Sequence, residues 1–349
     1  MTPPSQAAEA SAGTPGLGAA THAHHRAAAM LASPARLQRL LAFASLVVLL
    51  VAFSLASDNF LQADNLVSIL QATAVNGVLA IACTLVIISG GIDLSVGCLM
   101  TFCAVLAGVV LTGGGLPLPL GVAAAIGGGA LCGGLSGWLV AQLRVPAFIA
   151  TLGMMMLLKG LSLVISGSKP IYFLDTAGFD ALAQGSLIGA LLPALPLPNS
   201  VLVLFAVALG AGALLGQTLF GRYIFALGSN EEAARLSGLP VRRWKVAVYA
   251  LGGGLCGVAG LLMASRLNSA QPALGQGYEL EAIAAVVIGG TSLSGGRGSV
   301  LGTLIGAFIM SVLANGLRLM NVTQEWQTAV TGIIIVLAVY VDRLHQGHD

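Results

Sequence analysis

The chain has 349 residues, of which 57% are hydrophobic and only 8% are charged. Ordinary soluble domains are about 25% charged, so this composition excludes a water-facing surface over most of the protein and predicts a lipid bilayer around it. The formal net charge of +2 gives no indication of nucleic-acid binding. The five cysteines fall in apolar segments without a C-x-x-C pair, which favours buried hydrophobic side chains over disulfides or a metal site.

The two ends of the chain differ from its apolar middle. Residues 1–35 are rich in Ala, Gly, Pro, Ser and Thr and are predicted to form a disordered cytoplasmic tail. The run 40–57 carries no charge and is long enough to cross a hydrocarbon core of roughly 30 Å as a helix. It opens a predicted transmembrane domain at 36–341, and residues 342–349 are predicted to form a second cytoplasmic tail.

Ten apolar segments predict an all-α integral membrane protein with about ten transmembrane helices. The segment 279–291 is short for a complete crossing. Most basic residues fall on one side when crossings are counted from a cytoplasmic N-terminus, which predicts that both termini are cytoplasmic. The predicted spans are 40–57, 64–90, 93–112, 118–141, 147–166, 199–219, 246–265, 279–291, 299–317 and 326–341.

The predicted spans are rich in glycine, with 47 glycines in the chain. Gly129, Gly133 and Gly137 follow one another at four-residue spacing, as do Gly253 and Gly257. Small residues at this spacing let helix backbones approach closely in lipid. The pattern predicts a tightly packed helical bundle, with packing inside one chain favoured over a subunit interface.

A charged residue interrupts the apolar pattern between the second and third spans. The string ISGGIDLSVG places Asp93 beside Gly90 and Gly91. A carboxylate at the bilayer centre costs about 2.5–3.5 kcal/mol or more, so a mid-helix position is disfavoured. We expect the glycines to end one helix through positive φ and Asp93 to N-cap the next. The alternative is that the break lines a cavity, because irregular backbone at membrane depth needs protein or water around it.

A similar string recurs between the eighth and ninth spans. VIGGTSLSGGRGS contains Gly289 and Gly290 and shares the pattern G-G-x-x-L-S with the first string. Two matching breaks in two halves of a chain suggest an internal repeat, which is common in transporters.

The longest polar segment within the bundle, 228–245, lies between the sixth and seventh spans. Ser229 and Glu232 have the spacing of a capping box, and Gly238 and Pro240 are expected to end the helix. A helix of about two turns is therefore predicted.

This short helix, at about 229–240, would be marginal alone in water, so we expect it to dock. It rests either on its own bundle or on a cytoplasmic partner. Ala233, Ala234 and Leu236 are available for that contact.

Several blocks of sequence resemble one transporter family. Glu232-Ala233-Ala234 followed by Gly238 resembles the E-A-A-x-x-x-G coupling loop of ABC-importer permeases. The blocks SGGIDLSVG, VPAFIATLGMMMLLKGL and YELEAIAAVVIGGTSLSGGRGSVLGTLIGA resemble the ribose-type sugar permeases. The similarity runs from about residue 59 to 341, and Lys159 and Arg318 depart from the residues usual in the family.

The resemblance implies a non-catalytic permease subunit in the bacterial inner membrane. It would form a homodimer and move a monosaccharide, ribose-like or related, by alternating access. Two cytoplasmic ATPase subunits would use ATP and Mg²⁺, and a periplasmic or lipid-anchored binding protein would deliver the sugar. Consistent with this, the sequence has no G-x-x-x-x-G-K-[ST] phosphate loop, and no cofactor or metal is expected on this chain. The residues expected to couple to the ATPase are Glu231, Glu232, Ala233, Ala234 and Gly238.

Polar residues inside the spans are candidates for the translocation path. For each of them, hydrogen bonding between helices is an equally good interpretation. They are Gln71, Thr73, Asn76 and Asn315.

Charged residues at the outer edge leave two interpretations open. Glu279, Glu281 and Arg266 either meet the binding protein or are solvated edge charges.

The main alternative function is an ion-coupled secondary transporter of a small polar solute. That mechanism needs an embedded ionisable relay, for which Asp93 and Lys159 are the candidates. All five histidines lie in the two tails, which argues against a membrane enzyme with a buried histidine site.

Overall fold

The computed structural model describes residues 34–192 and 196–346. Most of the two predicted tails therefore lies outside the described residues. Two tail segments are helical: residues 34 and 35 belong to the first described helix, and residues 342–346 continue the last one. The helical domain is thus slightly longer at both ends than the predicted 36–341.

The described chain is all-α apart from two short strands, as the composition predicts. The strands β1 (Ile171–Tyr172) and β2 (Ser269–Ala270) pair antiparallel. The helices that occupy the predicted spans are α2 (Pro34–Ala56), α3 (Ala63–Ile88), α4 (Val96–Gly108) with its π-helical extension η1 (Val109–Gly113), α5 (Leu118–Ala141), α6 (Ala147–Ser166), α8 (Asn199–Gln217), α11 (Val241–Leu267), α12 (Tyr278–Ile288), α13 (Val300–Leu319) and α14 (Gln324–Gln346).

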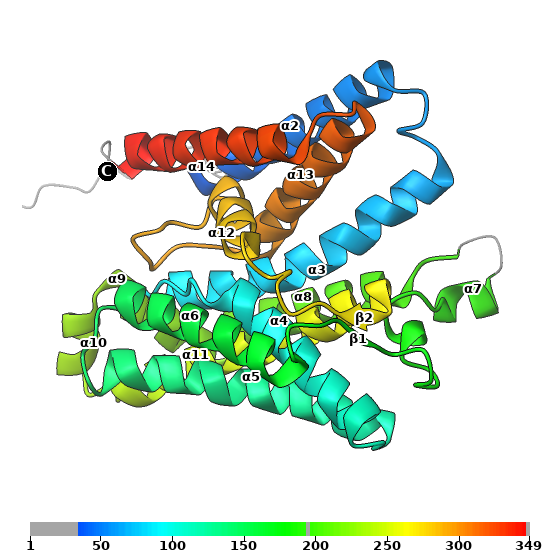
Figure 1. Ribbon diagram of the computed structural model, residues 1–349. Helices are drawn as coiled ribbons and strands as arrows, with labels where there is room; N and C mark the ends of the chain where they lie inside the picture. The colour runs from blue at the N-terminus through cyan, green and yellow to red at the C-terminus, as the bar shows by residue number, and fades with distance from the viewer. Residues whose placement is uncertain (1–33, 193–195, 347–349) are drawn as a thin grey trace, which may run out of the picture.

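The connections carry the remaining helices. A 3₁₀ turn (η2, Asp180–Leu182) and α7 (Leu187–Leu191) precede α8, and α9 (Leu219–Ser229) and α10 (Glu231–Leu236) precede α11. In Figure 1, α10 lies at one end of the bundle and α7 at the other.

Within the described residues, seven helices are long and apolar enough to cross a membrane: α3, α4 with η1, α5, α6, α8, α11 and α13. By contrast, α12 has 11 residues and is therefore about 16 Å long, too short to cross the hydrocarbon core. The predicted segment at 279–291 is thus a short helix and does not cross by itself. Gly277, with φ 101°, precedes it, and Gly290, with φ 86°, follows it.

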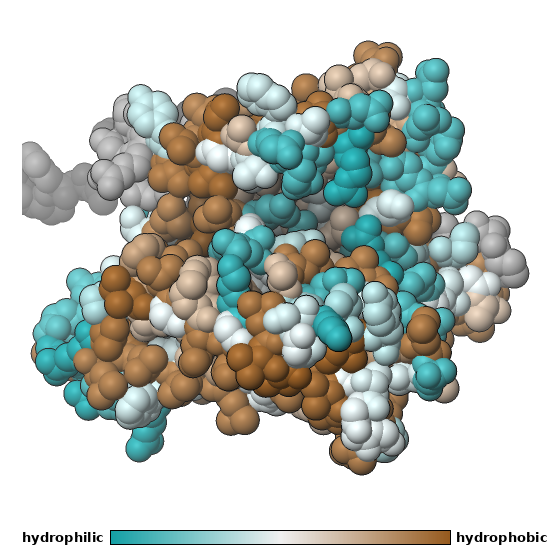
Figure 2. All heavy atoms as spheres, viewed as in Figure 1, coloured by the Kyte–Doolittle hydropathy of each residue, from teal (hydrophilic) through white to brown (hydrophobic). Residues whose placement is uncertain are grey.

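The helix α3 lies at the centre of the molecule. In its most apolar stretch 83% of the residues are buried, against 22% in α5 and 28% in α6. Figure 1 shows α3 running between a group formed by α2, α12, α13 and α14 and a second group that contains α5, α6, α10 and α11. Hydrophobic side chains cover much of the face seen in Figure 2, and hydrophilic ones gather at the end that carries α10.

The predicted close packing of glycine-rich helices occurs between α5 and α11. A Cβ atom at Gly133 would lie 3.0 Å from the Cα atom of Gly253, and one at Gly129 would overlap the Gly253 carbonyl oxygen. These glycines let the two backbones touch, so the four-residue spacing serves packing inside one chain.

Replacing Gly129 by valine should therefore destabilise the protein by at least about 1–3 kcal/mol, because the added methyl groups must push α11 away. Gly127 is the matched control in the same helix, since an added Cβ there meets no atom within 4 Å. Thermal unfolding of the purified variants in detergent measures the difference. Equal loss of stability in Gly129→Val and Gly127→Val would contradict this packing.

Candidate functional site

The first glycine break ends α3 in a regular cap. Gly90 has φ 79°, and its N–H donates to Ile87 O at 2.9 Å, while the N–H of Gly91 donates to Val86 O at 3.0 Å. This pair of bonds is the Schellman arrangement, in which a residue with positive φ closes the helix. Gly90 therefore has the role expected from the sequence.

The capping role predicted for Asp93 is wrong in detail. The N-cap of α4 is Ser95, two residues later, and α4 begins at Val96. Asp93 Oδ1 instead accepts hydrogen bonds from the Ser95 N–H at 2.8 Å and from the Ser95 hydroxyl at 2.6 Å. Asp93 thus forms a turn just before the helix, because its side chain reaches the backbone two residues on.

The second break has the same cap at the end of α12. Gly290 N–H donates to Val287 O at 2.9 Å, and Thr291 N–H donates to Val286 O at 3.1 Å. The residue with positive φ is thus the first glycine of the first string, Gly90, but the second glycine of the second string, Gly290. Gly289 is the C-cap and has φ −68°. The two breaks share their geometry, although the sequence match is shifted by one residue.

The two breaks meet each other and the end of α9. The carbonyl oxygen of Ile88, the last residue of α3, accepts a hydrogen bond from Gly296 N–H in the α12–α13 loop at 2.9 Å. A Cβ atom at Gly228 in α9 would overlap both of these groups, and one at Gly295 would lie 2.9 Å from the Cα atom of Gly90. We call Ile88, Gly90, Gly228, Gly295 and Gly296 the glycine junction. Three backbones meet there, with no room for a side chain at Gly228, Gly295 or Gly296.

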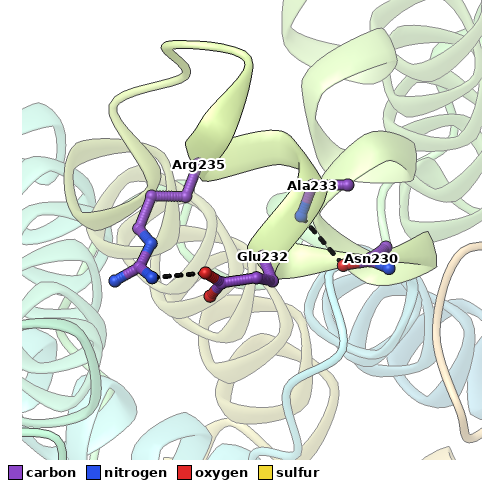
Figure 3. A network of polar contacts seen from close by, with 4 residues as sticks. All are labelled: Asn230, Glu232, Ala233 and Arg235. Atoms are coloured by element: carbon purple, nitrogen blue, oxygen red, sulfur yellow. Dashed lines mark hydrogen bonds and ion pairs between the residues drawn. The ribbon is translucent and has the colours of Figure 1, made fainter.

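The helix α10 begins at Glu231, three residues after Gly228. Its N-cap is Asn230, whose Oδ1 accepts from Ala233 N–H at 2.9 Å (Figure 3). The capping box predicted from Ser229 and Glu232 is therefore wrong. Ser229 is still helical and bonds back to Phe225 O, so the cap falls one residue later.

Ala234 anchors α10 to its own bundle. It is buried, with Leu227 of α9 and Val241 of α11, in a small apolar cluster against which Trp244 packs. For Ala234, the contact is therefore with its own bundle, one of the two alternatives that the sequence left open. The two glutamates of the first turn form ion pairs at α10: Glu231 with Lys245 at 2.6 Å, and Glu232 with Arg235 at 2.5 Å (Figure 3).

The opposite face of α10 is open. Ala233 is exposed, and Leu236 is 78% exposed although it is apolar. Gly238 ends the segment with φ 83°, and a Cβ there would meet no atom within 4 Å. Gly238 therefore serves the conformation of the turn, and α10 presents a small apolar face at the end of the bundle.

The four candidates for a translocation path are spread over α3 and α13. Thr73 is fully buried and its hydroxyl donates to Ile69 O in its own helix. Asn76 Nδ2 donates to Glu281 Oε2 at 3.2 Å, and Asn315 Nδ2 donates to Asn65 Oδ1 at 2.9 Å. Gln71 is half-buried. Hydrogen bonding between elements, the alternative interpretation, therefore holds for Asn76 and Asn315.

The acidic residues of α12 are not solvated edge charges. Glu279 is only 7% exposed, and its carboxylate accepts from Gly277 N–H at 3.1 Å. Glu281 is partly buried and holds Asn76. No pattern in the sequence predicts the Asn76–Glu281 pair, because 205 residues separate the two. Within the described residues, no three His, Cys, Asp or Glu side chains are grouped as metal ligands would be.

Comparisons with known proteins decide the family. The family described as "Branched-chain amino acid transport system / permease component" matches residues 65–339. The chain belongs to this family. The match covers most of the range over which the sequence resembles the ribose-type permeases, and it includes both breaks and α10.

Three relatives agree with this assignment. Ribose import permease protein RbsC of Escherichia coli (strain K12) is 45% identical over 305 residues, which cover 86% of this chain and 92% of that protein. RbsC of Bacillus subtilis (strain 168) is 42% identical, over 88% of this chain and 93% of its own. Fructose import permease protein FrcC of Rhizobium meliloti is 37% identical, over 85% and 83%. The resemblance to ribose-type permeases is thus confirmed, and the chain is a multi-pass membrane permease.

The corrected cap of α10 can be tested directly. Asn230→Ala should weaken the helix by about 1 kcal/mol because one amide loses its acceptor, whereas Ser229→Ala should have little effect. Hydrogen exchange of peptides covering residues 230–239 should be about fivefold faster in the first variant only. Faster exchange in Ser229→Ala alone would contradict the Asn230 cap and would support the capping box predicted from Ser229 and Glu232.

Proposed function

We propose that this chain is the membrane-spanning subunit of an ATP-driven importer that moves a monosaccharide, ribose-like or related, into the cytoplasm. The family match and the names of the relatives support an import permease and a sugar substrate. The observation that carries the ATP-driven part is α10, which is joined to the glycine junction on one side and exposes an apolar face on the other.

In this proposal α10 is the coupling helix that receives a cytoplasmic ATPase. Leu236 and Ala233 form the exposed contact, and Ala234 transmits movement because it is packed against α9 and α11. Glu231 and Glu232 hold the first turn through their ion pairs. ATP and Mg²⁺ would be bound by the ATPase, and this chain would perform no chemistry.

Movement of α10 would reach the helices through the glycine junction. The junction joins α9, which leads into α10, to the end of α3 and to the α12–α13 loop, and α3 contacts helices of both groups. A shift at α10 would therefore change how the two groups sit on each other, which is what alternating access between two sides of a membrane requires. A homodimer of this chain would surround the sugar, and Gln71, Thr73, Asn76 and Asn315 stay candidates for its path.

The proposed orientation places α10 and both chain ends in the cytoplasm. The opposite end, with α7 and the β1–β2 pair (Figure 1), would face the periplasmic or lipid-anchored binding protein. Lys159, within α6, donates to Gln276 Oε1 at 2.7 Å and is half-buried.

An ion-coupled mechanism has less support. Its two candidate relay groups are hydrogen-bonded to different partners. Asp93 accepts from Ser95 at the first break, and Lys159 donates to Gln276.

The contact with the ATPase can be tested with one substitution. Leu236→Asp should abolish co-purification of the ATPase and sugar-stimulated ATP hydrolysis, because a charge replaces the apolar contact. The fold should be unaffected, since this side chain lies outside the core. Leu191→Asp in α7 is the matched control, with a leucine 84% exposed at the opposite end of the bundle. Normal ATPase binding by Leu236→Asp would rule out α10 as the docking element.

The energy source needs a separate measurement. Vesicles containing this chain, its ATPase and its binding protein should take up radiolabelled ribose with internal ATP and no ion gradient. Uptake driven by an ion gradient with this chain alone would establish the secondary transporter instead.

A further inference from the structure

An open pocket of about 450 Å³ lies beside α10 at the end of the bundle. Its walls come from the first glycine break, the α5–α6 turn, α10 and the first turns of α11. Every one of these segments is a helix end or a connection, so the pocket lies where the bundle leaves the hydrocarbon layer. It is lined by Ser89, Gly90, Gly91, Val140, Ala141, Arg144, Val145, Pro146, Ala147, Glu231, Arg235, Val241, Arg242, Lys245 and Tyr249.

The pocket is strongly basic. Four of its lining residues are cationic, Arg144, Arg235, Arg242 and Lys245, and one is anionic, Glu231. Glu231 is already paired with Lys245, and Arg235 is paired with a glutamate outside the lining. Two positive charges are therefore left without a carboxylate.

Those two charges are Arg144 and Arg242. Arg242 Nη1 donates only to the neutral Gln142 Oε1, at 3.2 Å. Arg144 has no hydrogen bond or ion pair with any residue that the structure describes. Both are exposed and free to rotate toward an anion, and guanidinium groups bind phosphate oxygens in pairs.

Exposed apolar side chains neighbour the lining residues Arg144 and Ala147 in the chain. Leu143 on the α5–α6 turn and Phe148 and Ile149 in the first turn of α6 are next to these lining residues in the chain and are 55%, 52% and 54% exposed. They continue into α5 and α6, of whose apolar stretches little is buried. A ligand that reaches Arg144 from this side must therefore present an apolar part next to its anionic group.

We propose that the pocket binds the phosphate of an anionic phospholipid, with Arg144 and Arg242 as its ligands and the acyl chains along Phe148 and Ile149. Basic pockets between transmembrane helices are typical sites for such headgroups. The lipid would touch α10 and the first break at once, so bilayer composition would bear on the same segment that the proposed function assigns to coupling. The binding itself does not depend on that function.

The test uses the full-length protein purified in mild detergent, titrated with phosphatidylglycerol or phosphatidylcholine and measured by native mass spectrometry. The wild type should retain phosphatidylglycerol in preference to phosphatidylcholine. The double variant Arg144→Asn, Arg242→Gln should bind phosphatidylglycerol about 25-fold more weakly, since each basic group contributes about a factor of five. Asparagine is chosen because Arg144 has φ 55°, a conformation that asparagine tolerates.

The controls separate this pocket from general surface charge. The variant Arg222→Gln, Arg243→Gln removes two exposed arginines on α9 and α11 outside the pocket lining, and it should bind as the wild type does. If the first variant aggregates, Arg144→Lys, Arg242→Lys keeps both charges and should retain the lipid. An equal loss of phosphatidylglycerol binding in the Arg144/Arg242 variant and in the Arg222/Arg243 variant would overturn the proposal.

Further arms distinguish the source of the anion. Millimolar inorganic phosphate should fail to displace phosphatidylglycerol or to raise the thermal stability of the wild type. Stabilisation by phosphate without lipid retention would overturn the lipid assignment. Normal lipid binding by the double variant together with loss of ATPase binding would overturn it too, and would make the pocket a site for acidic groups of the ATPase.

Discussion

The structure depends on one close approach of backbones. The hydrogen bond from Gly296 N–H to Ile88 O forms only because Gly228 carries no side chain between them. The carbonyl oxygen of Ile88, a residue that is fully buried, would otherwise lack a partner, and an unsatisfied buried backbone group costs about 1–3 kcal/mol. The loop of the second break therefore supplies the hydrogen-bond donor for the carbonyl at the first break, and Gly228 of α9 packs against both groups.

This arrangement gives the short helix α10 its significance. Six residues cannot form a stable helix in isolation, and α10 is held by its Asn230 cap, by Ala234 in the apolar cluster and by the ion pairs of its glutamates. Because α10 begins three residues after Gly228 of the glycine junction, we expect movement of α10 to reach the end of α3 and the α12–α13 loop. A short helix that is fixed to the bundle and exposes one apolar face is suited to transmitting force from a partner.

The sequence was sufficient for the long elements and insufficient for the local geometry. Uncharged runs bounded by Pro and Gly placed helices such as α5 and α6 at their observed ends, because hydropathy alone decides which segments enter lipid. The capping residues were misplaced at Asp93 and Ser229, since Asp, Ser and Asn all have cap chemistry and only the backbone path decides which one is used. The paired glycines marked both breaks. The sequence pattern did not show that positive φ falls on the first glycine of one pair, Gly90, and on the second glycine of the other, Gly290.

Contacts between distant segments could not be predicted at all. The Asn76–Glu281 bond, the Arg144–Arg242 pocket and the Gly296–Ile88 bond each join residues far apart in the chain. Each polar side chain had a local explanation in the sequence, so its actual partner depended on how helices cross. The pattern of small residues showed that backbones approach closely without showing which ones meet.

The most direct test of the glycine junction is the transport activity of Gly228→Ala in the assembled importer. The added methyl group must separate Ile88 O from Gly296 N–H, so uptake of labelled sugar per ATP hydrolysed should fall by about tenfold while ATPase binding persists. Gly216→Ala in α8, where a Cβ meets no atom within 4 Å, should transport normally. Equal uptake by the two variants would contradict the claim that the junction links α10 to the helices.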